Sequence, residues 1–219
     1  MAITIKSERE IELMAEAGKI LERVHNELEK ALRPGMSTKD IDTLGEEIIR
    51  SYGCTPSFLN YNGYPASICV SVNQEVVHGI PDKHRIIQEG DIVSLDAGVI
   101  YKGYHSDAAR THAVGEVSEE AKKLIQVTKE SFFEGIKFAK AGNHLFDISG
   151  AIGRYAEERG YGVVRDLCGH GIGTALHEAP EIPNYEVGRK GVRLRPGMTL
   201  AIEPMINIGT HEVDWLDDD

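Results

Sequence analysis

Two aspartates in one β-rich segment are candidates for sharing a cation. Asp96 and Asp107 lie in the run DIVSLDAGVIYKGYHSD, where two β-rich stretches flank a turn around residues 101–103. In an antiparallel hairpin with an even-numbered loop, opposed residue numbers have an odd sum, so the two aspartates share a face. A turn on Tyr101 and Lys102 would place them directly opposite each other, with Cβ atoms about 5 Å apart, where like charges destabilise the pair. We expect the repulsion between the two carboxylates to be compensated by a proton, a basic side chain or a cation.

A third acid favours the metal interpretation. Asp96 follows Ile92 and Ser94 at period two, which predicts the inward face of the strand if Ile92 belongs to the core. Glu203 lies in the apolar run TLAIEPM, where an unpaired carboxylate would be costly. The simpler alternative for the two aspartates is one solvent-facing side chain and one turn former.

Histidines supply the remaining candidate ligands. His170 lies in CGHGIG, whose glycines indicate backbone that approaches another group closely. A phosphate-binding loop is a weaker alternative, because no lysine or helix start follows as in a P-loop. His177 follows in the same segment, and His78 lies in VVHGIP. We interpret the other six as ordinary core or surface residues: His25, His84, His105, His112, His144 and His211.

Composition narrows the classes of partner. The 219 residues include 24 basic and 35 acidic side chains, for a net charge of -11. This charge argues against direct nucleic-acid readout and suits a metal ion or a free peptide amine. Cys54, Cys69 and Cys168 are odd in number and widely spaced, so we expect neither a zinc motif nor a disulfide framework, but a reducing cytoplasm. No run approaches the roughly 18 apolar residues of a membrane span, so we expect no membrane partner.

Capping signals and periodicity predict an alternation of helices and strands. The capping box Ser7-x-x-Glu10 starts the first of four predicted helices. These helices cover residues 8–32, 37–53, 118–140 and 144–158. The β-rich runs are ICVSV, EVVHGI and DIVSLDAGVI, followed by residues 162–164 and MTLAIEPMINI.

The order of helix, helix and strands occurs twice. Several residues have counterparts 107 positions later: Gly35 and Gly142, Asp40 and Asp147, Ile41 and Ile148, Gly53 and Gly160, Gly90 and Gly197, Asp96 and Glu203. Chance alignment of common glycines is the alternative. We predict a single catalytic domain, residues 1–219, with an internal repeat of approximately 8–107 and 115–219. Asp96 and Glu203 would then occupy equivalent strand positions about a pseudo-two-fold axis.

From about Ile5 to Asp219 the chain resembles the type I methionine aminopeptidases. The motifs that carry the resemblance are YNGYPASICVSVN, EVVHGIP, DIVSLDAGVIYKGYHSDAARTHAVG, LCGHGIGTALHEAP and RPGMTLAIEPMINIG. The resemblance implies an α+β pita-bread fold, in which two pseudo-symmetric helix–helix–strand halves form a curved antiparallel sheet covered by helices. It also implies metal-dependent removal of N-terminal methionine from nascent peptides and proteins.

The resemblance assigns roles to the candidate ligands. Asp96 would chelate one metal and Asp107 would bridge two, while His170 and Glu203 would complete the shell of the second. The resemblance implies two divalent ions, and mostly carboxylate ligation with one imidazole suits Co, Mn or Fe(II), with Zn as an alternative.

The resemblance also implies catalytic and substrate-binding residues. His78 would hydrogen-bond the scissile amide, His177 would steady the substrate carbonyl, and Glu203 would transfer a proton to the leaving nitrogen. The substrate-binding set, for whose aromatic members plain core packing is the alternative, is Phe58, Tyr61, Tyr64, Cys69, His78, Leu176 and His177.

One feature departs from the family pattern. The family has a fifth ligand, a bridging glutamate in an FEHT motif on a final strand, whereas this sequence ends at VDWLDDD. Glu212 and Asp214 are late candidates, but we favour a chain truncated at its C-terminus. We therefore expect impaired activity, because a metal bridge and part of the pocket wall would be missing.

Two other functions stay open. An Xaa-Pro aminopeptidase of the same fold usually carries an extra N-terminal domain, whereas here the first helix begins at about Ser7. A non-catalytic pita-bread binding module typically lacks the metal ligands, of which four of five are present. The expected partner is the N-terminal methionine of nascent chains, with the ribosome as a candidate partner, and we expect a monomer.

Overall fold

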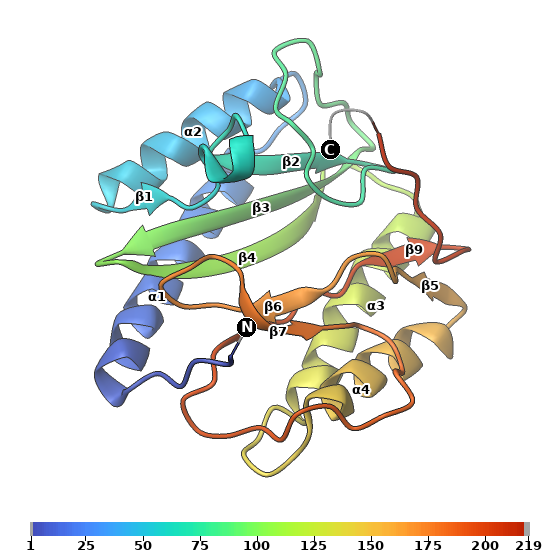
Figure 1. The fold of residues 1–219 in the computed structure, drawn as a ribbon. Coiled ribbons are helices and arrows are strands. Elements are labelled where there is room, and N and C mark those ends of the chain that lie inside the picture. The colour runs from blue at the N-terminus through green and yellow to red at the C-terminus, as the bar shows by residue number, and fades with distance from the viewer. Residues whose placement is uncertain (1, 217–219) are drawn as a thin grey trace. The chain divides into compact units, whose positions relative to one another are not determined.

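The computed structural model describes residues 2–216, which form two compact units (Figure 1). We name them after their candidate ligands. The aspartate unit comprises Glu8–Ala121 and Gly173–Leu176. Within the described residues, the histidine unit comprises residues 2–7, 122–172 and 177–216. Both units combine helices with antiparallel strands, which confirms the α+β class.

The aspartate unit consists of two helices and a four-stranded antiparallel sheet. Its elements are α1 (Glu8–Ala31), α2 (Thr38–Ser51), β1 (Thr55–Pro56), the short 3-10 helix η1 (Tyr61–Gly63), β2 (Ile68–Val72), β3 (Ile92–Tyr101) and β4 (Tyr104–Ala113). Strand β3 lies at the centre, since β1, β2 and β4 all pair with it. The first two predicted helices are confirmed to within about two residues, the usual uncertainty of a helix end.

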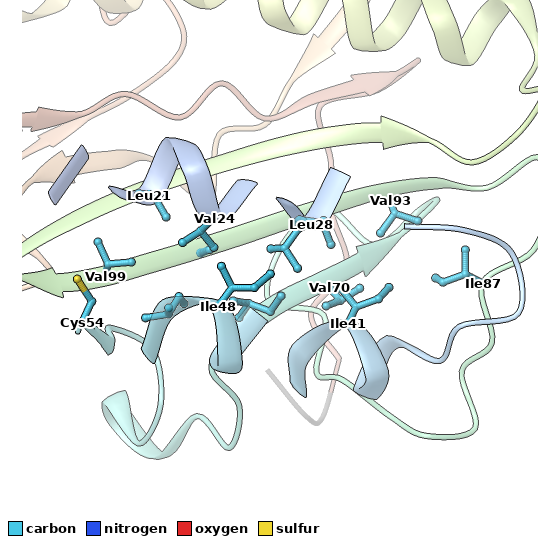
Figure 2. Packing of buried hydrophobic residues seen from close by; sticks show 14 of the residues in the cluster. Leu21, Val24, Leu28, Ile41, Ile48, Cys54, Val70, Ile87, Val93 and Val99 are labelled. Atoms are coloured by element: carbon cyan, nitrogen blue, oxygen red, sulfur yellow. The ribbon is translucent and has the colours of Figure 1, made fainter. Parts of the chain in front are cut away.

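Two helices cover one face of this sheet. Leu21 and Val24 of α1 and Ile41 of α2 are fully buried and pack against Val93 and Val99 of β3 (Figure 2). Alternate residues of a strand point to opposite faces, so the odd-numbered side chains of β3 form the helix-covered core.

Asp96 therefore lies on the face of β3 that the helices do not cover. Ile92 shares that face and is only half-buried, so the condition under which Asp96 would point to the core, that Ile92 belongs to it, is not met. Period-two alternation identifies two faces, but it does not tell which one the helices cover.

The register of the β3–β4 hairpin also differs from the prediction. The turn lies on Lys102 and Gly103, whose φ angles of 50° and 86° are those of a type I′ turn. Asp96 pairs with Ala109 and Asp107 pairs with Gly98, so paired numbers sum to 205, not 203. The odd sum confirms that both aspartates share a face. They are not directly opposite but diagonal neighbours, a relationship in which Cα atoms lie roughly 7–8 Å apart.

The histidine unit contains two helices and two small sheets. Its elements are α3 (Glu119–Ile136), α4 (Leu145–Glu157), β5 (Tyr161–Val163), β6 (Gly169–Gly171), β7 (Glu178–Ile182), β8 (Leu200–Ala201) and β9 (Ile206–Ile208). The first three residues of α3 belong to the aspartate unit. Strand β6 lies between β7 and β8, and β5 pairs with β9. Fully buried Leu145, Ile148 and Ile152 of α4 pack with Ile182 of β7 in the core of this unit.

Three predicted segments are corrected. The third helix ends at Ile136 and not at about residue 140, because residues 138–139 bond three residues back as in a turn. The run EVVHGI, residues 75–80, contains no strand. MTLAIEPMINI is divided into β8 and β9 around Pro204, which has no N–H to donate to a strand ladder.

The two units repeat local hydrogen bonds at the same offset of 107 residues. Gly35 N donates to Ile87 O over 2.9 Å, and Gly142 N donates to Leu194 O over 3.0 Å. Ahead of α2, Ser37 N donates to Asp40 Oδ2 over 2.8 Å, and the equivalent bond before α4 joins His144 and Asp147 over 2.8 Å. Isolated bridges pair Ser37 with Ile86 and His144 with Arg193. These parallels support an internal duplication within one catalytic domain, which stays a proposal.

No helix within residues 2–216 has the length and apolar character needed to cross a bilayer.

Candidate metal and substrate residues

In the aspartate unit, the face of the sheet opposite the helices carries candidate ligands from β3 and β4. Asp96 and Asp107 are half-buried there, and Cys69 of β2 pairs directly with Asp96. Burial raises the pKa of the Cys69 thiol, and the nearby Asp96 charge raises it further. The Cys69 thiol is therefore neutral where it lies beside the carboxylates. The Tyr64 hydroxyl donates towards Ile68 O at 3.2 Å and Gly79 O at 3.1 Å, which holds the tyrosine beside β2.

The loop containing His78 is attached to the edge of β2. Val70 N donates to Gly79 O over 2.9 Å, and Gly79 N donates to Ser71 Oγ over 3.1 Å. A Cβ atom on Gly79 would lie 2.4 Å from Val70 O, so only glycine allows this approach. His78 is exposed and has φ 57°, a left-handed conformation that is uncommon outside glycine and is frequent at functional sites.

Within the histidine unit, the candidate ligands His170 and Glu203 lie close together. His170 Nε2 lies 3.1 Å from Glu203 Oε1. Glu203 Oε1 is buried and accepts no hydrogen bond from any residue that the structure describes. The other ring nitrogen, Nδ1, lies 2.8 Å from Gly171 O. Because a carbonyl only accepts, Nδ1 carries a proton, and in a neutral ring the lone pair is then on Nε2.

This geometry fits a shared cation. Two ligand atoms that each lie about 2.1 Å from one ion are roughly 3 Å apart when their bonds to it are perpendicular. An imidazolium–carboxylate ion pair would place a hydrogen bond across the gap, and none is present between His170 and Glu203. Metal-binding histidines commonly donate their second N–H to a backbone carbonyl, as His170 does to Gly171.

Glycines place His170 between two strands. A Cβ atom on Gly169 would lie 2.3 Å from Ala201 O, and one on Gly171 would lie 2.1 Å from Ala179 O. The prediction of close backbone approach around His170 is confirmed, and the approaching groups are carbonyls of the chain itself. Glu203 is the second residue after β8, whose Ala201 pairs with His170.

Sequence reasoning missed Asn184, which supports the Glu203 backbone. Its side chain is fully buried, and Nδ2 donates to Glu203 O over 2.8 Å. No local pattern distinguishes this asparagine, since its partner lies on a distant segment.

His177 lies beside His170 in the same unit. The two ring centroids are 4.2 Å apart and the rings are nearly perpendicular, at 84°. The neighbouring Glu178 forms an ion pair with buried Lys6, with Nζ 2.6 Å from Oε2. His177 itself is exposed, so its ring is accessible to a substrate.

The other expected substrate-binding residues all belong to the aspartate unit. Phe58, Cys69 and Leu176 are buried, and Tyr61 and Tyr64 are half-buried. The apolar members thus share one unit with Asp96 and Asp107.

Comparisons with known proteins place the chain in a family. The model of metallopeptidase family M24 matches residues 12–218. A methionine aminopeptidase of Clostridium acetobutylicum is 56% identical over 218 residues, which are 97% of this chain and 87% of the relative. Methionine aminopeptidase 1 of Bacillus subtilis is 50% identical over 216 residues, covering 99% and 87% of the two chains.

Solved structures agree. The crystal structure of methionine aminopeptidase from Rickettsia prowazekii superposes with a TM-score of 0.97 at 38% identity, covering 100% of this chain and 88% of that one. An Xaa-Pro dipeptidase from Bacillus anthracis has a TM-score of 0.80 at 33% identity, but this chain covers only 54% of it. The likeness confirms the expected pita-bread fold and favours the methionine aminopeptidases over the Xaa-Pro alternative. The chain therefore belongs to metallopeptidase family M24, among the methionine aminopeptidases.

Proposed function

We propose that this chain removes N-terminal methionine from peptides and proteins with divalent metal held by Asp96, Asp107, His170 and Glu203. The observation that carries the proposal is the approach of His170 Nε2 to Glu203 Oε1, 3.1 Å apart with no hydrogen bond accepted by that oxygen. Membership of a metallopeptidase family supports a divalent metal. The two aspartates add charge on one sheet face, and a hard donor set of this kind suits two ions of Mn, Fe(II) or Co, with Zn as an alternative.

Bound metal would supply a water molecule of lowered pKa and polarise the substrate carbonyl. Glu203 would accept a proton from that water and pass it to the leaving nitrogen. Asn184 Nδ2 donates to the backbone oxygen of Glu203, which positions the backbone from which this side chain extends. The Gly171 carbonyl holds the His170 ring in one tautomer, so Nε2 is ready to bind without a prior proton shift.

His78 and His177 would contact the substrate directly. In this proposal His78 donates to the scissile amide, and its positive φ and attached loop set its direction before binding. His177 donates to the carbonyl oxygen as negative charge develops, an effect that is large in many hydrolases.

Methionine would be selected by an apolar wall. Phe58, Tyr61, Tyr64, Cys69 and Leu176 are the proposed lining residues. Cys69 lies opposite Asp96 in the β2–β3 register, so an apolar side chain bound there would be next to the metal ligands. Discrimination by a single methylene is worth only about 1–3 kcal/mol, so the wall must be held firmly in place.

We further propose that the substrates are nascent chains near the ribosome, that the protein is a monomer, and that it works in the cytoplasm. The odd number of widely spaced cysteines supports the reducing compartment. The similarity to two methionine aminopeptidases supports N-terminal methionine as the residue that is removed.

A reconstitution assay tests the proposed function. Protein stripped with a chelator is assayed with Mn, Fe(II), Co or Zn added singly, on Met-Ala-Ser and on an Xaa-Pro peptide. We expect metal-dependent release of free methionine and little cleavage of the Xaa-Pro peptide. Preferential Xaa-Pro cleavage would favour the related peptidase, and stoichiometric metal binding without any cleavage would favour a non-catalytic module.

A further inference from the structure

Ser57 and His105 form a buried polar pair beside the proposed methionine wall. His105 Nδ1 lies 3.0 Å from Ser57 Oγ, within hydrogen-bond distance. Both residues are buried, His105 with 9% and Ser57 with 5% of its surface exposed, and both belong to the aspartate unit. No role in the proposed reaction has been assigned to either, and sequence reasoning placed His105 among the ordinary histidines.

One side of this pair positions the segment that carries Phe58. Ser57 follows β1, and its backbone N donates to Gly98 O over 2.9 Å. A Cβ atom on Gly98 would lie 2.6 Å from Ser57 Cβ and 3.0 Å from Phe58 Cε1. Ser57 and Phe58 therefore pack directly on Gly98. Since Gly98 is the register partner of Asp107, the segment lies on the strand pair β3–β4, which carries Asp96 and Asp107.

The other side holds the segment that carries Leu176. The backbone N of His105 donates to Gly173 O over 2.8 Å. A further bond from Gly173 N to Ala175 O, 3.0 Å long, makes this segment a tight turn. Leu176 at its end is almost completely buried. His105 thus contacts both segments that carry residues of the wall. Its side chain reaches Ser57, next to Phe58, and its backbone N donates to Gly173 O, near Leu176.

We propose that the Ser57–His105 pair positions the methionine-binding wall relative to Asp96 and Asp107 and so helps to determine specificity. The inference rests on the proposed function. His105 and Asp107 lie two residues apart on the same face of β4, so a wall attached to His105 keeps a constant distance from Asp107. Loss of the side-chain link frees the Phe58 segment without removing a ligand or a lining residue.

Ser57→Ala tests the proposal because it removes one oxygen and leaves a small side chain. We expect KM for Met-Ala-Ser to rise about 3- to 10-fold, the effect of one net hydrogen bond, while kcat and bound metal stay near wild type. The preference for methionine over leucine at the first position should fall. Ser57→Thr, which keeps the hydroxyl, should restore both values.

Ser131→Ala is the matched control, because Ser131 is a fully buried serine on α3 whose Oγ donates to Thr128 O over 2.7 Å. It should leave KM and selectivity unchanged even if it lowers the melting temperature. Unchanged KM and selectivity in Ser57→Ala would overturn the positioning role, as would a parallel loss of kcat and metal at constant KM. If wild-type protein with metal releases no methionine, the proposed function fails and this inference fails with it.

Discussion

His170 Nε2 and Glu203 Oε1 lie 3.1 Å apart, yet the carboxylate oxygen accepts no hydrogen bond from the described part of the chain. Two groups with acceptor character at this distance repel each other unless a cation or a proton lies between them. The carbonyl of Gly171 already takes the proton of Nδ1. The pair is thus arranged for a metal ion before the ion binds, and it belongs to a single compact unit.

Replacing either member of this pair should abolish metal-dependent cleavage. His170→Ala removes the imidazole and Glu203→Gln removes the carboxylate charge, and we expect metal affinity to fall by more than about 100-fold in each, beyond the usual effect of outer-shell partners. Titration calorimetry with Mn measures this directly. His84→Asn, at an exposed position, is the control and should bind metal like wild type. Unchanged affinity in both ligand variants would exclude the pair from the site.

Gly171→Ala should destabilise the fold strongly. The added Cβ would lie 2.1 Å from Ala179 O, so β6 and β7 would have to separate. We expect a loss of about 3 kcal/mol or more in the free energy of unfolding, measured by urea denaturation. Gly18→Ala is the contrast, since its Cβ would meet only Ser106 Oγ at 3.7 Å, within helix α1. That variant should be neutral or gain about 0.5–1 kcal/mol.

Buried His25 should make the protein less stable in mild acid. Its Nε2 lies 2.7 Å from Ala108 O, and burial lowers its pKa to about 4. The Ala108 carbonyl and Asp107 oppose this shift, and the charges of Arg110 and His112 add to it. Because the unfolded state binds the proton near pH 6.5, the stabilisation is complete above that pH and is lost as the pH falls towards 4.

The expected loss between pH 7 and pH 5 is about 2 kcal/mol from this group. Urea denaturation at the two pH values measures it, and His25→Leu should show a correspondingly smaller difference. Burial also lowers the pKa of His112, so part of the pH dependence should remain in that variant. A pH dependence equal to wild type in His25→Leu would show that His25 is not the source.

The buried Lys6–Glu178 pair should be strongly coupled. The two side chains are only 6% and 11% exposed, and Lys6 also donates to Thr4 Oγ1. Lys6→Met leaves the carboxylate buried without its cation, and we expect a loss of about 3–5 kcal/mol. The double variant Lys6→Met, Glu178→Gln should recover part of this loss. A double-mutant cycle with additive single effects would contradict the coupling.

Local signals in the sequence determined the helices and the candidate ligands. The capping pairs at Ser37–Asp40 and His144–Asp147 mark the starts of α2 and α4, because a capping box needs only residues within one turn. The offset of 107 residues was visible for the same reason, since glycines at turns such as Gly35 and Gly142 adopt positive φ locally. The carboxylates attracted attention because acids in apolar runs need compensation.

Tertiary structure alone decided how these residues meet. Two adjacent two-residue turns were compatible with the hairpin, and the choice of Lys102–Gly103 moved Asp107 from opposite Asp96 to its diagonal. The covered face of β3 depended on where α1 and α2 pack. The approach of His170 to Glu203, and the link between Ser57 and His105, join segments more than 30 residues apart. Contacts of this kind arise from packing of distant elements, which periodicity and capping within a few residues do not encode.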